Sequence, residues 1–246
     1  MESALNKLKP TLGEENYQKL NKINNSSLYE FIEKYVELCN PAKIFVCNDS
    51  PQDVAYIREN AIKSGAERAL VTPGHTIHFD AAGDQGRDKE HTNILIPKGV
   101  ELGEAISTRD REEGLKEIHE ILKDMMKGKE MYICFFCLGP TNSEFSIPCV
   151  QLTDSSYVAH SERLLYRSGY DEFVRQGASA HFYKFVHSQG EVDARKVSKN
   201  LDKRRIYIDL DGEIVYSTNT QYGGNTIGLK KLAMRLAINQ AARKGG

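Results

Sequence analysis

The sequence predicts an α/β fold in which a mixed β-sheet is flanked by helices. Short β-rich runs alternate with segments of helical periodicity along most of the 246 residues. Residues 131–137 form the most convincing buried strand, because the run is almost entirely apolar. Residues 205–217 carry the strongest hairpin signal, with two β-rich runs on either side of Asp211-Gly212.

In the first third of the chain, local signals predict a helix, a strand, a second helix and a second strand, at residues 27–40, 43–47, 50–65 and 69–72. The first helix opens with the capping box Ser27-x-x-Glu30 and stops at Asn40-Pro41. The second has proline at its first position and Gly65 at its end. The strand, helix, strand order predicts an α/β unit.

A long polar stretch follows at residues 73–92, and such loops are often functional. The elements predicted after it are a strand at 93–97, a helix at 112–126, strands at 131–137 and 149–152, a helix at 161–167, a strand at 180–186, the hairpin strands 205–210 and 213–217, and a last helix over 229–237.

The composition argues against whole-molecule attraction to nucleic acid or to anionic membranes. Lysine and arginine total 33 against 34 aspartates and glutamates, which gives a formal charge of −1. The longest apolar run, residues 131–138, is far too short to span a bilayer. No secretory signal pattern opens the chain. A soluble, cytoplasmic protein is expected.

Two pairs with three-residue spacing raise the question of a metal. Cys134 and Cys137 form a C-x-x-C, but on a strand they point to opposite faces and no second pair completes a zinc site. The five cysteines are an odd number, which argues against a disulfide scaffold, and buried thiols are expected. His75 and His78 lie in a loop without a matching ligand pair, so a polar loop is the favoured interpretation.

The most informative segment is residues 221–231, where a glycine turn, an aromatic ring and Lys230-Lys231 lie between a predicted strand and helix. Glycines and a helix N terminus favour anions. The interval from Gly223 to Gly228 fits a nucleotide P-loop, but Leu229 stands where that motif has lysine. An anion cradle of another kind and a simple glycine-rich helix cap both remain open.

A basic cluster lies at residues 195–205, with six lysines and arginines interspersed with aspartate. It could contact phosphates. It lacks the aromatic residues of a single-strand platform and any recognisable binding module. A solvated surface is the favoured interpretation.

Together these blocks resemble the N-terminal, substrate-binding part of GTP-dependent phosphoenolpyruvate carboxykinases. The resemblance runs from about residue 25 to the last residue. Its blocks are Met131-Tyr132 with Gly139-Pro140, Leu152-Thr153-Asp154-Ser155-Ser156-Tyr157-Val158, and Tyr222-Gly223-Gly224-Asn225 with Lys230-Lys231. Arg87, in its glycine-containing loop, falls where the family has a substrate-clamping arginine.

The resemblance implies a reversible conversion of oxaloacetate and GTP to phosphoenolpyruvate, GDP and carbon dioxide, with Mn²⁺ or Mg²⁺. Decarboxylation leaves an enolate whose charge needs a metal and fixed donors, and the enolate then attacks the γ-phosphoryl group of GTP.

The resemblance also implies a role for each matching residue. Arg87 would hold a substrate carboxylate with its guanidinium fork. The segment Tyr222-Gly223-Gly224-Asn225 would bind the same ligand, with the Gly224 N–H donating to it and the Tyr222 ring packed beside it. Lys230 would face the transferring phosphoryl group, and Lys231 would be a metal ligand.

The departures from the family limit this implication. The family's consecutive Gly-Lys-Thr, its histidine and aspartate metal ligands and its guanine pocket are not in these 246 residues. We therefore expect residues 1–246 to be the oxaloacetate/phosphoenolpyruvate-binding domain without its C-terminal nucleotide-binding partner, and to be inactive alone. The alternatives are a non-catalytic anion-binding or regulatory module, and a nucleic-acid-binding domain that uses residues 195–205.

Overall fold

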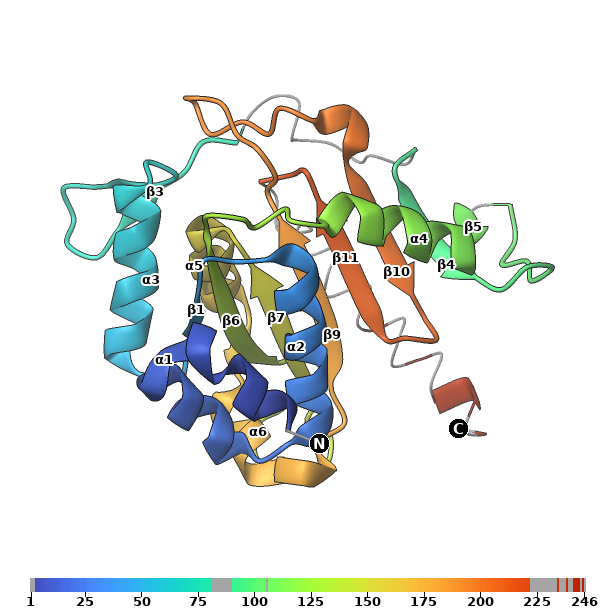
Figure 1. Ribbon diagram of the computed structural model, residues 1–246, viewed down its shortest axis with the longest axis horizontal. Helices are drawn as coiled ribbons and strands as arrows, with labels where there is room; N and C mark the ends of the chain where they lie inside the picture. The colour runs from blue at the N-terminus through green and yellow to red at the C-terminus, as the bar shows by residue number, and fades with distance from the viewer. Residues whose placement is uncertain are drawn as a thin grey trace.

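The computed structural model describes residues 3–80, 90–104 and 106–221, together with residues 234, 238, 241–243 and 245. These residues contain a nine-stranded mixed sheet with helices on both faces, which confirms the predicted α/β fold (Figure 1). A second, two-stranded sheet lies apart from it. None of the described helices is long and apolar enough to cross a membrane.

The main sheet combines parallel and antiparallel neighbours. Across it the order is β1 (Lys43–Val46), β6 (Glu130–Cys137), β7 (Pro148–Thr153), β9 (Tyr183–Ser188), β11 (Ile214–Thr218), β10 (Arg205–Asp209), β4 (Thr92–Ile96) and β5 (Thr108–Asp110), with β8 (Arg167–Ser168) paired to β6. Strands β7, β9 and β11 run parallel to one another. The predicted hairpin is confirmed, because β10 and β11 pair antiparallel from Asp209↔Ile214 to Arg205↔Thr218.

Each face of the sheet carries its own hydrophobic core. Helices α1 (Ala4–Ile23), α2 (Ser26–Cys39), α4 (Arg111–Leu122) and α6 (Tyr170–Gln176) contribute to one core. Helices α3 (Pro51–Lys63) and α5 (Ser156–Leu165) contribute to the other. Strand β6 is buried on both faces, since Ile133 and Phe135 face the first core while Cys134 and Phe136 face the second.

The capping residues in the sequence predicted the start of α3 correctly and the start of α2 incorrectly. Helix α3 begins as predicted, with the Ser50 side chain accepting from the Asp53 N–H and proline at the first turn. The prediction that Ser27 caps α2 in a capping box is wrong. The cap of α2 is Asn25, whose Oδ1 accepts from the Leu28 N–H at 2.9 Å while its Nδ2 donates to the Gly177 carbonyl at 2.8 Å. That second bond is long-range, so the sequence alone did not show it.

The predicted strand–helix–strand unit is also wrong at its last element. Strand β2 (Arg68–Ala69) pairs with β3 (Thr76–Ile77) in the separate two-stranded sheet. Leu70 and Val71 are exposed, so the apolar run does not enter the main sheet. Helix α1 was not predicted, because Pro10 and Gly13 interrupt its periodicity, and Gly13 has a φ of 69°.

Several predicted boundaries shift. Helix α4 ends at Leu122 rather than at residue 126, and α5 begins at Ser156, capped by Ser155, rather than at residue 161. Strand β9 begins three residues later than predicted. The short strand β5 and helix α6 were not predicted. All five cysteines are buried and form no disulfide bonds, as predicted.

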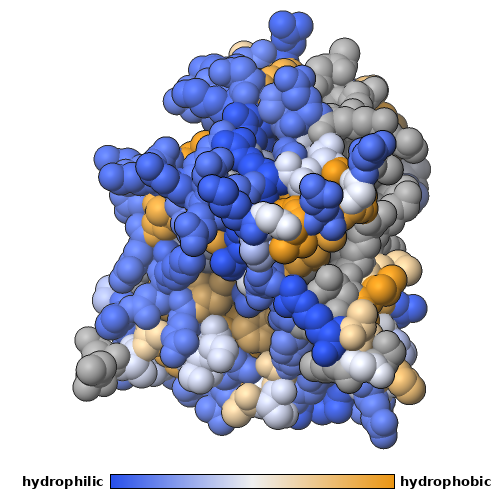
Figure 2. Space-filling view, turned by 90° about the vertical axis from the view of Figure 1, so that its right-hand side faces the viewer, coloured by the Kyte–Doolittle hydropathy of each residue, from blue (hydrophilic) through white to orange (hydrophobic). Residues whose placement is uncertain are grey.

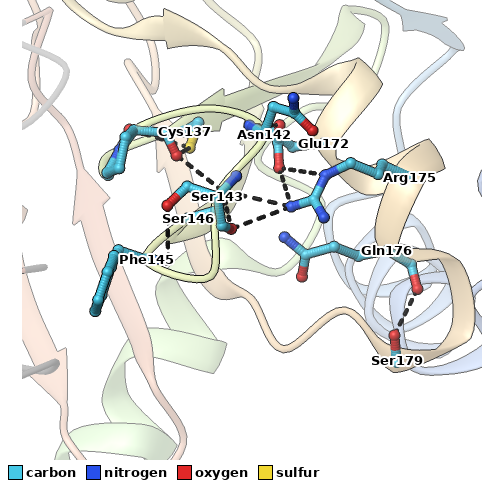
Figure 3. Close-up of polar contacts among 11 residues, drawn as sticks. Cys137, Asn142, Ser143, Phe145, Ser146, Glu172, Arg175, Gln176 and Ser179 are labelled. Atoms are coloured by element: carbon cyan, nitrogen blue, oxygen red, sulfur yellow. Dashed lines mark hydrogen bonds and ion pairs between the residues drawn. The ribbon is translucent and has the colours of Figure 1, made fainter.

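The loop between β6 and β7, residues 138–147, is fixed against α6 by polar contacts (Figure 3). The buried Glu172 carboxylate accepts from the Asn142 N–H, and Arg175 donates to Glu172 at 2.6 Å and to the Ser143 carbonyl at 3.3 Å. Burial alone would raise the pKa of Glu172, but Arg175 and the Asn142 N–H lower it. This network fixes the edge of the sheet where β7 begins. On the side of the molecule seen in Figure 2, hydrophilic side chains dominate and apolar ones appear in separate groups.

Candidate functional site

The candidate site lies at the edge of the sheet where β7, β9 and β11 end. The three strands are parallel, so their C-terminal ends meet at one edge. The register places Thr153 beside His187, and His187 beside Ser217. In open α/β sheets, ligands bind outside the carboxyl ends of the strands. We call this region the C-terminal edge.

His187 joins the ends of the three strands. Its Nε2 lies 3.0 Å from the Thr220 carbonyl, which can only accept, so Nε2 carries the hydrogen. Its Nδ1 lies 2.7 Å from the Thr153 hydroxyl, which then donates to it. The same hydroxyl accepts from the Ser155 N–H at 3.1 Å. The imidazole is buried and fixes the residues just before the glycine-rich segment.

Asp154 links the ends of the neighbouring strands β7 and β9. Its side chain is 0% exposed and accepts from Lys129 Nζ at 2.7 Å and from the Ser188 hydroxyl at 2.7 Å. The Gln189 N–H donates to the other carboxylate oxygen at 2.9 Å. Lys129 also donates to the Gly190 carbonyl at 2.7 Å. The carboxylate is therefore fully engaged in holding the turn after β9.

The segment that precedes residues 81–89 is anchored on α5. The His78 ring stacks on Tyr157 at 3.6 Å, and its Nδ1 lies 2.6 Å from the Ala66 carbonyl. His160 Nδ1 donates to the Glu67 carboxylate at 2.8 Å. Burial would raise the pKa of Glu67, but its hydrogen bonds to His160 and Thr76 outweigh burial and lower it. Since α5 follows β7, Asp80 lies on the side of the C-terminal edge.

The segment that follows residues 81–89 returns to the same edge. Thr92, the first residue of β4, pairs with Ile206, and Ile206 pairs with Ser217. The His91 carbonyl accepts from the Ile206 N–H at 2.9 Å. Residues paired in register therefore run from Thr92 through Ser217 to Thr153, and both undescribed segments, 81–89 and 222–233, attach at this row.

Every site residue predicted from sequence lies outside the described residues. This applies to Arg87, Tyr222, Gly223, Gly224, Asn225, Lys230 and Lys231. The last predicted helix, residues 229–237, also falls there, apart from Met234. The structure describes the attachment points of these segments and not the positions of their side chains.

Three residues of the edge, His187, Lys129 and Ser217, were not predicted from the sequence. A signal was present for His187, because His187-Ser188-Gln189-Gly190 repeats the pattern of Thr153-Asp154-Ser155, in which polar residues directly follow a buried strand. The Ser217 hydroxyl is buried in the row and has no hydrogen-bond partner within the described part of the chain.

The described residues of this edge are suited to positioning. The Asp154 carboxylate and the His187 ring are already hydrogen-bonded to neighbouring segments, so they hold the edge in place. In the described ranges, no group of three histidine, cysteine or acidic side chains could hold a metal ion.

The basic residues at 195–205 are partly engaged. The Arg205 guanidinium pairs with Glu117 at 3.0 Å and donates to the carbonyls of Asp202 and Arg204. Arg195 remains largely exposed beside Asp193. Arg205 is therefore held within the fold, while Arg195, Lys199 and Lys203 lie exposed.

Comparison with known proteins agrees with the resemblance noted in the sequence. The sequence profile of the phosphoenolpyruvate carboxykinase N-terminal domain matches residues 30–242. A protein named phosphoenolpyruvate carboxykinase [GTP] from Thermococcus sibiricus is 62% identical over 238 residues, which cover 97% of this chain and 38% of that protein. Its namesake from Pyrococcus abyssi is 61% identical over 98% of the chain and 39% of its own length.

More distant relatives carry the same name. The Chlamydia felis protein is 34% identical over 91% of the chain and 39% of its own length. The chain thus spans well under half the length of these relatives. The profile match and the identities agree with the fold, and the chain belongs to the family of phosphoenolpyruvate carboxykinase N-terminal domains.

Proposed function

We propose that this chain supplies the oxaloacetate- and phosphoenolpyruvate-binding part of a GTP-dependent phosphoenolpyruvate carboxykinase. The whole enzyme would convert oxaloacetate and GTP to phosphoenolpyruvate, GDP and carbon dioxide in the cytoplasm. The names of the relatives support the reaction. The nucleotide would be bound mainly by a C-terminal domain, in the part of the relatives that this chain does not span.

The observation that carries the proposal is the common attachment of two segments. Residues 81–89 include Arg87, residues 222–233 include Tyr222 and both lysines, and both segments join the described structure at the C-terminal edge. An arginine fork and glycine N–H groups that share one edge suit a small dicarboxylate. In this proposal Arg87 binds one carboxylate, and Gly223, Gly224 and Asn225 bind the rest of the ligand beside Tyr222.

The two lysines would have different tasks. Lys230 would neutralise the phosphoryl group during its transfer. Lys231 would bind Mn²⁺ or Mg²⁺, and when bound the metal would stabilise the enolate charge. Only a neutral amine can donate its lone pair, and from a reference pKa of 10.4 deprotonation at pH 7 costs about 4.6 kcal/mol. A divalent cation beside the amine offsets that cost, so we expect Lys231 to be charged in metal-free protein.

The test is a calorimetric titration with oxalate, a dicarboxylate that resembles the enolate. Arg87→Ala is expected to weaken binding at least tenfold, a loss of about 1.4 kcal/mol. Arg195→Ala is the matched control, because it removes an exposed arginine on another loop and should leave oxalate affinity unchanged. Equal affinities for wild type and Arg87→Ala would contradict the assigned role.

Turnover provides a second test. The proposal places the nucleotide pocket and the remaining metal ligands outside these 246 residues, so the pure chain should not decarboxylate oxaloacetate in a GTP-dependent way. Carbon dioxide release that requires GTP and persists through purification would contradict the proposed division of the enzyme.

A further inference from the structure

A cavity lies at the opposite ends of β9 and β11, two of the strands that form the C-terminal edge. Its volume is about 550 Å³, within the range of small-molecule sites, and it lies between α2, α4, the start of β9 and the β10–β11 hairpin. The apolar part of its wall comes from Phe31, Leu115, Phe182 and Ile214. We call this cavity the α2–α4 cleft. It uses none of the residues of the C-terminal edge.

Lys184, on β9, brings a half-buried cation without an ion-pair partner among the described residues into the cleft. In the described part of the chain no carboxylate lies within ion-pairing distance of its Nζ. The Nζ lies over the Phe182 ring, 5.9 Å from the ring centroid. Burial lowers the pKa of Lys184 more than Glu213 and Asp209 raise it, and Lys34 lowers it further. Charges that are partly withdrawn from water are normally paired, so this half-buried ammonium group favours an anionic partner.

His119, on α4, brings a second unpaired nitrogen. Its Nε2 is buried and has no hydrogen-bond partner among the described residues. Burial and the charge of Lys34 both lower its pKa. Lys34, His119 and Lys184 all line the cleft, and the charge of Lys34 lowers the pKa of the other two groups. An anion in that space would relieve their mutual repulsion.

Two tyrosines add a donor to the same wall. The hydroxyls of Tyr35 and Tyr216 lie 2.7 Å apart, and both side chains are buried. One hydroxyl hydrogen is used between them, which leaves the other for an acceptor. The Tyr216 ring lies edge-on to His119, with 6.1 Å between the ring centroids.

Two of the three carboxylates around the cleft have partners of their own. Asp209 accepts two hydrogen bonds from Arg111, at 2.7 and 2.8 Å. Glu213 pairs with His181 at 3.0 Å. Glu30 is the third, and it lies exposed on α2. The first two carboxylates are therefore engaged, which leaves the exposed Glu30 at the rim and Lys184 and His119 Nε2 without partners among the described residues.

We propose that the α2–α4 cleft binds a small organic acid, with its carboxylate held by Lys184, His119 and the spare tyrosine hydroxyl. Its apolar body packs between Phe31 and Phe182. The site is separate from the C-terminal edge, and it does not depend on the function proposed for that edge.

The test compares benzoate with benzamide, its uncharged analogue, by calorimetry on this chain. Benzoate should bind at least tenfold more tightly than benzamide. Lys184→Met should remove at least tenfold of the benzoate affinity. Lys63→Met is the control, since it removes an exposed lysine on α3 and should leave benzoate binding unchanged.

NMR of the histidine rings supplies an independent readout. Benzoate should raise the pKa of His119, and the His119→Gln variant identifies the signal. Binding should persist in Arg87→Ala, which separates this cleft from the oxalate site. No benzoate binding, equal affinity for benzamide, full affinity in Lys184→Met or loss of affinity in Arg87→Ala would each overturn the proposal.

Discussion

The polar groups at the two ends of strands β9 and β11 differ in whether they have hydrogen-bond or ion-pair partners. At the C-terminal edge, the Asp154 carboxylate and both ring nitrogens of His187 have partners at 2.7 to 3.0 Å. In the α2–α4 cleft, Lys184 Nζ has no ion-pair partner and His119 Nε2 has no hydrogen-bond partner within the described residues. Both regions are lined by polar groups, but the imidazole is hydrogen-bonded through both nitrogens only at the first, where the Ser217 hydroxyl lacks a partner among the described residues.

This difference in hydrogen bonding indicates two roles for a polar side chain, one in stabilising the fold and the other in binding a ligand. A satisfied buried network holds backbone segments in place, here the attachment points of residues 81–89 and 222–233. An unsatisfied group carries a free-energy cost that a ligand can offset. Substitutions should therefore destabilise the C-terminal edge and should not destabilise the cleft.

The largest expected effect is at Asp154. Asp154→Ala leaves Lys129, Ser188 and the Gln189 N–H without their acceptor, and breaking a buried charge pair costs about 3–5 kcal/mol. Urea unfolding measures the loss. Glu59→Gln on exposed α3 is the control and should change stability by less than about 1 kcal/mol. If Asp154→Ala lost no more unfolding free energy than the control, the claim that the C-terminal edge is stabilised by its hydrogen-bonded network would be contradicted.

His187 should show a smaller loss. His187→Phe keeps the ring and removes both nitrogens, so the Thr153 hydroxyl and the Thr220 carbonyl lose their buried partner. Each unpaired group costs about 1–3 kcal/mol, and we expect a loss of about 2 kcal/mol in urea unfolding. The control is His181→Phe, because that ring is largely exposed. Comparable losses at both histidines would show that the buried hydrogen bonds of His187 at the C-terminal edge do not contribute to stability.

The pH dependence of stability should report His119. Its folded pKa lies below the ordinary histidine value of about 6.5, so as the pH falls the unfolded chain takes up this proton first. The contribution is present above about pH 6.5 and is lost as the pH falls below that value. The urea midpoint should therefore decline less in His119→Gln over this range. Parallel pH profiles for variant and wild type would contradict the assigned burial.

The smallest effect, and one of opposite sign, is expected at Lys184. Lys184→Met removes a desolvated cation and keeps a side chain of similar length, so the free protein should gain stability by less than about 1 kcal/mol. Thermal unfolding without ligand measures this change. A clear loss of stability would show that Lys184 is already paired in the free protein.

The sequence was informative where structure depends on neighbouring residues. The buried strand at Glu130–Cys137, the hairpin around Asp211-Gly212 and the cap of α3 follow from periodicity, turn residues and a serine before proline. It failed where distant segments decide. Asn25 caps α2 while bonded to Gly177, and β2 pairs with β3 instead of joining the main sheet.

The same division applies to the candidate site. Thr153-Asp154-Ser155 follows a buried strand and was noticed, but its partner His187 lies 34 residues away in the sequence and is brought close only by the pairing of β7 with β9. The unpaired state of Lys184 depends on which carboxylates the fold places nearby, and Arg111 holds Asp209 from 98 residues away. No local pattern contains that information.

The central claim is that residues 81–89 and 222–231 together form one dicarboxylate site at the C-terminal edge. The most direct measurement is an NMR titration of backbone amides with oxalate, in wild type and in Arg87→Ala. We predict that amides of both segments shift with one common midpoint, that Arg87→Ala weakens both responses together, and that amides of the α2–α4 cleft remain unchanged. Shifts in only one segment, or different midpoints for the two, would contradict the account.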